Sequence, residues 1–219
     1  EGIAPYRADS LKDLKKFCEK ERIKLKIFSF VKEAGKTLDK VMQKQKMQAC
    51  AVCGPMRRGL LEEHSQGYDK IATGHNADDE LQSFLMNVFR GDVDSIARAG
   101  PASGSGQKRK NSQRIKPLYS CFEKEVKLYA FLKGIDFDFK ECPYVVDSYR
   151  AKVRDLLNEY ASENQGAKQN MLLKYLDTLR KLKPKASETY TAKNCVKCGR
   201  ECRESVCSFC RTKEMYFLN

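Results

Sequence analysis

The segment of residues 70–90 constrains the fold of this chain more than any other, because it has the pattern of a strand followed directly by a helix. Residues 70–73 form a short apolar run, and an amphipathic helical pattern extends over residues 76–90. The polar residues between them therefore lie at the carboxyl end of a strand, where open α/β sheets bind their ligands. The sequence predicts an α/β protein with a ligand site at this turn.

Composition limits the class of protein and the kind of partner. With 219 residues, of which 41% are hydrophobic, the chain is long enough for one α/β domain and a small appendage. No apolar run approaches the roughly 18 residues that cross a bilayer, so we expect no membrane partner. The net charge of +13 favours a polyanionic partner, with RNA the first choice, over a surface that is merely rich in lysine.

Hydrophobic periodicity predicts further elements along the chain. Amphipathic helices are expected at residues 9–21, 122–132, 148 onward and 166–182, and strands at 25–30 and 135–139. The glycine- and serine-rich residues 99–113 are expected to form a loop that carries the basic run Lys108, Arg109 and Lys110. Pro184 is expected to end the last helix before a linker at 183–193. The predicted divisions are an α/β catalytic domain at 1–160, a helical segment and linker at 161–190, and a ribbon at 191–219.

Four carboxyl-terminal cysteines indicate a structural metal site. They form two Cys-x-x-Cys pairs with a short spacer, a donor set that suits tetrahedral zinc in a module too small to fold without metal. Cys202 lies between the pairs and is surplus, since a ligand exchange with a neighbouring cysteine would strain the knuckle geometry. The predicted zinc ligands are Cys195, Cys198, Cys207 and Cys210.

Three other cysteines stand out from the apolar pattern. Cys50 and Cys53 form a Cys-x-x-Cys pair without helical periodicity around it, and Cys142 precedes a proline, whereas Cys18 and Cys121 have the pattern of core residues. On local grounds the pair fits a redox couple, half of a zinc site or part of an iron–sulfur site. Three thiols would hold a [4Fe–4S] cluster and leave one iron without a protein ligand, free to bind a sulfide.

Four motifs in combination resemble those of the PP-loop ATPases that thiolate tRNA, in particular the archaeal and eukaryotic cytosolic tRNA 2-thiolation proteins. The resemblance covers nearly the whole chain, including the carboxyl-terminal cysteine pairs. The motifs are Cys-x-x-Cys-Gly-x-x-Arg-Arg from Cys50, Ala-Thr-Gly-His-Asn-Ala-Asp-Asp from Ala72, Leu-Met-Asn-x-x-Arg-Gly-Asp from Leu85 and Glu-Cys-Pro-Tyr from Glu141.

The resemblance implies a fold and a reaction. The fold is adenine-nucleotide-hydrolase-like, of the PP-loop or HUP type, with a parallel sheet, flanking helices and a carboxyl-terminal zinc ribbon. In the reaction, ATP with Mg²⁺ adenylates O2 of a uridine, and a sulfur nucleophile then displaces AMP to give 2-thiouridine, at the wobble position by resemblance. Thiolation of a cytidine or of a T-loop uridine stays open.

The resemblance also implies roles for particular residues. An aspartate would position Mg²⁺ or a proton, and an arginine would stabilise developing negative charge. The implied cluster ligands are Cys50, Cys53 and Cys142, the implied ATP-binding residues are Gly74, His75 and Asn76, and the implied catalytic residues are Asp78, Asp79 and Arg57.

One family motif, the phosphate-binding Ser-Gly-Gly-x-Asp-Ser, is absent from these residues. The match begins at residues 1–3, which resemble the end of the family's second strand, so we expect the first strand, this loop and an amino-terminal zinc knuckle to lie upstream. The alternative is a remnant that has lost ATP chemistry and serves as a non-catalytic, zinc-containing tRNA-binding subunit of a thiolation complex.

The resemblance implies a cytoplasmic protein with tRNA and ATP as partners, and with sulfide or a ubiquitin-like sulfur carrier as donor. It leaves a homodimer and a heterodimer both open. Basic residues near the ribbon and on the helix after residue 148 predict an electrostatic cradle for tRNA. They are Arg150, Lys152, Arg154, Lys193, Lys197, Arg200, Arg203 and Arg211.

Overall fold

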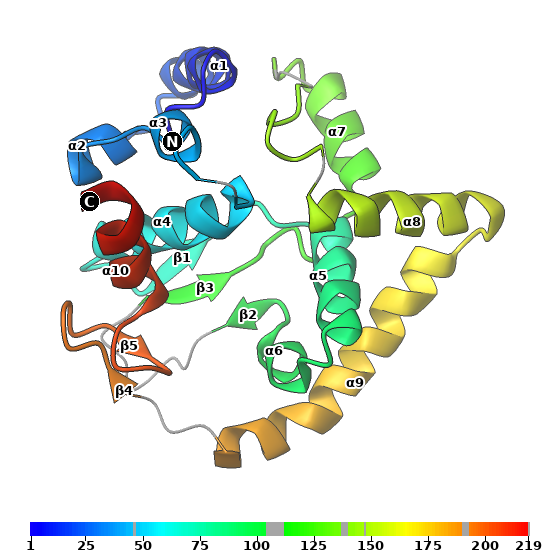
Figure 1. Cartoon of the computed structure of the whole chain (residues 1–219). Coiled ribbons are helices and arrows are strands. Elements are labelled where there is room, and N and C mark those ends of the chain that lie inside the picture. The colour runs from blue at the N-terminus through cyan, green and yellow to red at the C-terminus, as the bar shows by residue number, and fades with distance from the viewer. Residues whose placement is uncertain (46, 104–111, 137–139, 147, 190–192, 219) are drawn as a thin grey trace. The chain divides into compact units, whose positions relative to one another are not determined.

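The computed structural model of the chain describes residues 1–45, 47–103, 112–136, 140–146, 148–189 and 193–218 (Figure 1). Two compact units divide the chain, and each has its own hydrophobic core. Within the described residues, no helix combines the length and the apolar character that crossing a membrane would require. The first unit comprises Glu1–His64, Lys127–Ser148 and Asn194–Asn219, and the second comprises Ser65–Val126 and Tyr149–Lys193.

The first unit contains the helix predicted at residues 9–21 but not the strand predicted at residues 25–30. Residues 25–29 are in neither a helix nor a strand, and Ser29 instead begins a helix, because its side chain accepts a hydrogen bond from the Lys32 N–H at 3.2 Å. Phe30 is then buried in the core, so the strand prediction for 25–30 is wrong. The first helices are α1 (Tyr6–Lys20), α2 (Phe30–Ala34), α3 (Leu38–Met42) and α4 (Ala49–Glu63).

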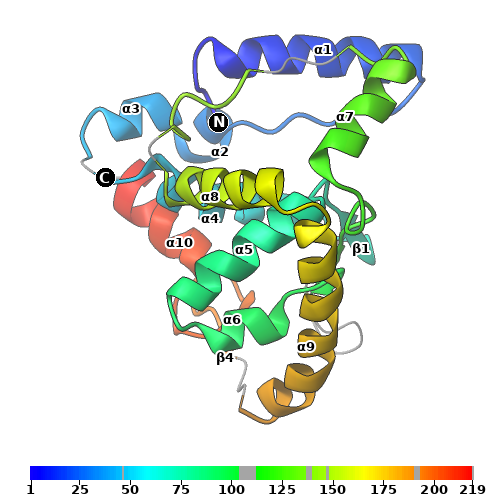
Figure 2. The ribbon, with the colours of Figure 1, turned by 90° about the vertical axis from the view of Figure 1, so that its right-hand side faces the viewer.

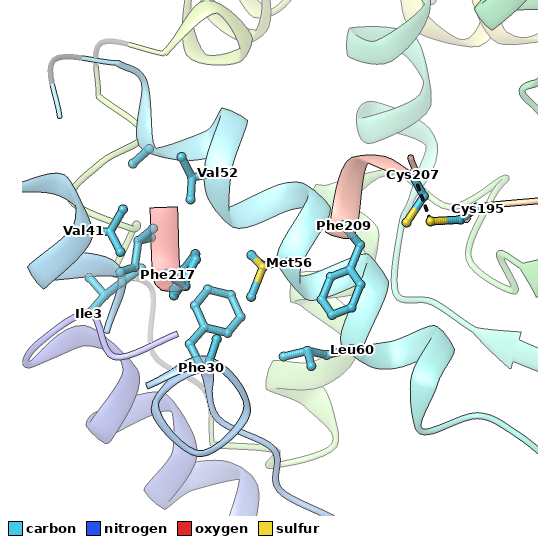
Figure 3. Close-up of a cluster of buried hydrophobic side chains, with 13 residues drawn as sticks. Ile3, Phe30, Val41, Val52, Met56, Leu60, Cys195, Cys207, Phe209 and Phe217 are labelled. Atoms are coloured by element: carbon cyan, nitrogen blue, oxygen red, sulfur yellow. Dashed lines mark hydrogen bonds between the residues drawn. The ribbon is translucent and has the colours of Figure 1, made fainter. Parts of the chain in front are cut away.

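Helix α4 provides the apolar face around which the first unit packs. Val52, Met56 and Leu60 recur every four residues and are 0%, 0% and 5% exposed, as expected for one buried stripe of a helix. Figure 3 shows these side chains directed toward Phe30, Phe217 and Phe209. Cys50 and Cys53 also lie on α4, so the non-periodic segment predicted around them is helical.

The carboxyl-terminal ribbon folds onto α4. Its two short strands, β4 (Lys193–Asn194) and β5 (Glu201–Cys202), pair with each other and precede α10 (Ser208–Thr212) and the π-helix η1 (Lys213–Leu218). Helix α10 packs against α4 (Figure 1), and Phe209 and Phe217 enter the same core as Met56.

The second unit contains a small mixed sheet with the strand order β1-β3-β2. Strand β1 (Lys70–Ala72) runs parallel to β3 (Gln113–Ile115), with Ile71 opposite Arg114. Strand β2 (Ala102–Ser103) pairs antiparallel to β3. The predicted α/β class and the strand at residues 70–73 are therefore confirmed, whereas the sheet is mixed and not entirely parallel.

Helices surround this sheet in the second unit. Helix α5 packs against α8 and α9, α6 packs against α9, and α8 and α9 form an angled helix pair (Figure 2). Leu81 of α5 is fully buried among Tyr119, Leu157 and Leu172. The helices are α5 (Ala77–Phe89), α6 (Val93–Arg98), α8 (Tyr149–Glu163) and α9 (Ala167–Thr189), while α7 (Glu123–Leu132) extends across the division between the units.

Several predicted boundaries need correction. Helix α1 begins at Tyr6 instead of residue 9, and α9 continues beyond Pro184 to Thr189, so most of the predicted linker is helical. A proline removes one backbone donor and bends a helix, but it does not oblige the helix to stop. Ile135 and Asp136 are in no strand, and the rest of that predicted strand lies outside the described residues, as does the basic run Lys108–Lys110.

Replacing Leu81 by alanine tests the packing of α5. Leu81 is 0% exposed, so we expect Leu81→Ala to lower the free energy of unfolding by about 2–5 kcal/mol. Val88 lies on the same helix and is 45% exposed, so Val88→Ala should cost less than about 1 kcal/mol. Urea denaturation measures both, and equal losses would contradict the packing described.

Candidate functional site

The predicted site residues belong to two sets, one in each compact unit. The cysteines of both predicted metal sites and Arg57 belong to the first unit, whereas the residues of the strand-to-helix turn, 74–79, belong to the second. Each set has its own local geometry.

The four ribbon cysteines form a compact ligand group. The sulfur atoms of Cys195, Cys198, Cys207 and Cys210 all lie within 4.8 Å of one another. Cys198 Sγ and Cys207 Sγ are 3.7 Å apart, close to the roughly 3.8 Å that tetrahedral Zn–S bonds would impose. This separation is far longer than a disulfide bond. The four-cysteine group that the spacing predicted is present.

Backbone N–H groups donate hydrogen bonds to these sulfur atoms and favour the thiolate form that binds a cation. The N–H of Cys207 donates to Cys195 Sγ at 3.3 Å, and the N–H of Cys210 donates to Cys207 Sγ at 3.4 Å. Burial opposes ionisation of Cys195, but hydrogen bonds from backbone N–H groups outweigh it and lower the pKa of this thiol to about 6. Burial raises the pKa of Cys210. One thiolate is thus favoured before any metal binds.

Cys202 lies apart from the four grouped cysteines. Its thiol donates a hydrogen bond to the Glu204 carbonyl at 2.9 Å, and burial raises its pKa. The tight group excludes Cys202, in agreement with its interpretation as surplus.

The second cysteine set also lies in the first unit. Cys50 is exposed at the beginning of α4, and Cys53 follows three residues later on the same side of the helix. Cys53 and Cys142 pack against the same core. Tyr144 fixes the segment of Cys142, because its hydroxyl donates to Asp39 Oδ1 at 2.8 Å. Across the part of the chain that the structure describes, only the ribbon cysteines are gathered as a tight metal-ligand group.

Cys53 is surrounded by charged groups. Burial and, to a smaller extent, the Glu1 carboxylate raise the pKa of its thiol to about 11, although Arg57 and Arg7 oppose this rise. Arg57 and Arg7 both pair with Glu1, at 3.1 and 2.6 Å. Arg57 is thus placed beside Cys53 within the first unit.

In the second unit, the turn after β1 is organised by a capping box. The Asp79 N–H donates to Asn76 Oδ1 and the Asn76 N–H donates to Asp79 Oδ2, both at 3.1 Å. These bonds satisfy two donors at the beginning of α5. Arg150 completes the arrangement, with its Nη1 3.6 Å from Asp79 Oδ1 and 3.2 Å from Gln82 Oε1.

His75 and Gly74 lie immediately before this cap. His75 Nδ1 is 2.9 Å from Thr73 Oγ1, and burial lowers the pKa of the imidazole, which keeps it neutral near pH 7. A Cβ atom at Gly74 would meet no atom within 4 Å, so the space beside this residue is open.

Asp78 is buried and bonded on both carboxylate oxygens. Lys168 Nζ donates to Oδ1 at 2.5 Å, and the Glu123 N–H at the start of α7 donates to Oδ2 at 2.7 Å. A second buried pair joins Lys116 to Glu80 at 2.6 Å. Sequence reasoning missed Lys168 and Lys116, since nothing local marks a lysine that will pair with a carboxylate 90 or 36 residues away.

Several of the basic residues expected to contact RNA already have protein partners. Arg200 donates to the Gly59 carbonyl at 3.1 Å, Arg211 pairs with Glu204, and Lys197 pairs with Glu214. Their availability for tRNA stays a prediction.

Comparison with known proteins identifies relatives, although no family model matches. The chain is 35% identical to a tRNA 2-thiolation protein NcsA of Haloferax volcanii, over 98% of this chain and 70% of that protein. It is 34% identical to a probable sulfurtransferase of Methanocaldococcus jannaschii, over 96% and 62%. With the cytoplasmic tRNA 2-thiolation protein 1 of Danio rerio the identity is 37%, over 76% and 50%.

A solved structure has a similar fold. The U34-tRNA thiolase NcsA from Methanococcus maripaludis, determined with its [4Fe–4S] cluster, matches with a TM-score of 0.70 and 35% identity. The match covers 82% of this chain and 60% of that protein. The chain thus spans between half and 70% of the length of these relatives.

The buried pair of Asp78 and Lys168 gives a prediction about stability. The two side chains are 8% and 18% exposed, so Asp78→Asn leaves a buried ammonium without its counter-charge. We expect a loss of about 3 kcal/mol in the free energy of unfolding, of which Lys168→Met in the same chain should restore part. The matched control is Asp155→Asn, which removes an exposed partner of Arg154 and should cost less than about 1 kcal/mol. If Asp78→Asn left the free energy of unfolding unchanged, the Asp78 carboxylate would not be needed for stability and would be available to a ligand.

The environments of Cys50 and Cys53 predict different reactivities. With a pKa near 11, the Cys53 thiol stays protonated at pH 8, and its alkylation rate should rise with pH up to about that value. The exposed Cys50 should react first with iodoacetamide, as peptide mass spectrometry of the cluster-free chain would show. Cys50→Ser serves as control for competition between the two thiols. Equal rates at pH 8 would show that Cys53 is not shielded.

Proposed function

The chain belongs to the tRNA 2-thiolation protein family, and on that premise we propose that it acts as a tRNA sulfurtransferase. The observation that carries this proposal is the 35% identity over 98% of the chain to a tRNA 2-thiolation protein. The 0.70 TM-score to a U34-tRNA thiolase supports the wobble uridine as the substrate position. In this reaction ATP activates O2 of the uracil, sulfur replaces that oxygen at C2, and AMP leaves with it.

Cys50, Cys53 and Cys142 are the proposed ligands of a [4Fe–4S] cluster. The donor set fits in chemistry: three thiols belong to one compact unit, and two of them pack against the same core. When bound, the cluster supplies an iron without a protein ligand, where the sulfur to be transferred can be held. Arg57 lies beside Cys53 and pairs with Glu1 through Nε, but its side chain is 56% exposed, so its guanidinium can also attract an anionic group of the substrate.

The turn of residues 74–79 is the proposed ATP site. The open space beside Gly74 lets a ligand approach the backbone, and the neutral His75 can exchange a hydrogen bond with it. The capping box of Asn76 and Asp79 keeps the first turn of α5 ordered, and the positive end of the helix dipole then attracts phosphate. We assign Mg²⁺ positioning to Asp79, whereas the two bonds to Asp78 suit a residue that positions α5.

The four ribbon cysteines are proposed to bind zinc. Four sulfurs within 4.8 Å of one another enclose room for a single tetrahedral ion. In a [4Fe–4S] cluster each thiolate binds a different iron, which requires wider spacing. We therefore assign the iron–sulfur cluster to the other cysteine set.

The proposed partners follow from the family. They are tRNA, ATP and a sulfur donor, which is sulfide or a ubiquitin-like carrier, in the cytoplasm. The charge of +13 suits the polyanionic tRNA. A non-catalytic tRNA-binding subunit is the second candidate, and the engagement of both Asp78 oxygens within the protein favours it.

Cysteine variants test the proposed function. Under anaerobic conditions with ATP, sulfide and tRNA, the reconstituted protein, expressed with any phosphate-binding segment that its gene encodes before residue 1, should form 2-thiouridine, measured by mass spectrometry of tRNA nucleosides. We expect Cys50→Ala, Cys53→Ala and Cys142→Ala each to abolish the product, while Cys121→Ala keeps it because this cysteine is in neither set. All four variants should retain about one zinc per chain. Product formation by the three ligand variants would reject the cluster assignment, and ATP-independent binding of tRNA without product would favour the second candidate.

A further inference from the structure

The ribbon approaches α4 so closely that one position of the helix must be glycine. A Cβ atom added to Gly59 would lie 2.1 Å from Cδ2 and 2.2 Å from Cγ of Phe209, well inside van der Waals contact. Phe209 is only 6% exposed and packs in the core with Met56 and Leu60 of the same helix (Figure 3). The aromatic ring of the ribbon thus rests directly on the backbone of α4.

A second contact acts at the same point. Arg200 of the ribbon donates to the Gly59 carbonyl at 3.1 Å, and its guanidinium lies 5.0 Å from the centre of the Phe209 ring. The two ribbon side chains therefore contact both α4 and each other. This arrangement needs a defined orientation of α10 relative to β5.

The four-cysteine group sets that orientation. Phe209 lies between Cys207 and Cys210 in sequence, and the Cys207 side chain caps α10 by accepting from the Cys210 N–H. Figure 3 shows Cys195 and Cys207 next to each other, close to Phe209. A ribbon this small has little core of its own, so a metal bound to its thiols supplies much of its folding free energy.

The same α4 carries Cys50 and Cys53 closer to its amino terminus. Cys53 precedes Gly59 by six residues, which corresponds to about 9 Å along the helix axis. Val52 and Met56, both 0% exposed, connect the two places through one buried face. A change in how the ribbon holds Gly59 therefore changes how firmly the helix around Cys53 is fixed.

We propose that Phe209, Arg200 and Gly59 are positioning residues that couple the metal centre of the ribbon to the order of Cys50 and Cys53 on α4. Metal binding by the ribbon then stabilises the working cysteine pair, and by linkage a ligand on that pair stabilises the ribbon metal. The inference rests on the proposed function only in treating Cys50 and Cys53 as the working pair.

The test measures access to Cys53 without any tRNA or activity. The full-length chain, free of cluster and loaded with zinc, is treated with iodoacetamide, and the alkylation rate of each cysteine is followed by peptide mass spectrometry. We expect Gly59→Ala to speed alkylation of Cys53 by about tenfold or more, through local opening of α4. Gly54→Ala is the matched control, since it is the same change on the same helix and its Cβ would meet only the flexible end of Arg58.

Cys18 is the internal reference, because it is buried in α1 of the same unit and is distant in sequence from the ribbon. Phe209→Leu, a milder change, and removal of zinc with a chelator should each expose Cys53 while Cys18 keeps its protection. A Cys53 rate that is unchanged in both would overturn the proposal. So would an equal rise at Cys18, which would show general unfolding. Failure here leaves the thiolation assay of the cysteine variants unaffected, so the two proposals fail separately.

Discussion

The buried stripe of α4 is the constraint on which the first unit depends. Val52, Met56 and Leu60 are supplied by a single helix, but their partners come from the amino terminus, from α2 and α3, and from the last residues of the ribbon. Fixing one helix therefore orders segments separated by well over a hundred residues. The unit packs around α4. Because Cys50 and Cys53 lie at the beginning of this helix, the same packing fixes their positions.

Several polar residues of the second unit stabilise its fold and also lie where an α/β protein binds its ligands. Asn76 and Asp79 satisfy the first donors of α5, and Asp78 neutralises a buried lysine and caps α7. Carboxylates at the end of a parallel strand are also where an α/β protein binds nucleotide and metal. One oxygen of Asp79 accepts the capping hydrogen bond and the other forms an ion pair with Arg150 at 3.6 Å, so a metal bound there would compete with this guanidinium.

Sequence reasoning succeeded where a local signal determined the structure. Helix α5 was predictable within one residue because Asn76 begins a capping box before an apolar period, and the grouping of the four ribbon cysteines followed from their spacing. It failed where residues distant in the sequence determine the local structure or the pairing of a side chain. Residues 25–30 alternate as a strand would, yet Ser29 and the burial of Phe30 make a helix there, and the lysine that pairs with Asp78 is 90 residues away. The helix that carries Cys50 and Cys53 was also missed. Gly54 and Pro55 disfavour a helix locally, and most of the buried positions of α4 come after them in the sequence.

The contacts of Arg200 change how the charge of the ribbon should be interpreted. A basic residue in the cysteine-rich ribbon is a natural candidate for a phosphate contact, but this guanidinium donates to the backbone of α4 and lies over Phe209. Removing its charge would therefore alter packing as well as attraction to RNA, and a weaker complex would have two causes. A test of RNA binding by the ribbon therefore needs basic residues outside its contact with α4, because only these change the charge without changing the packing.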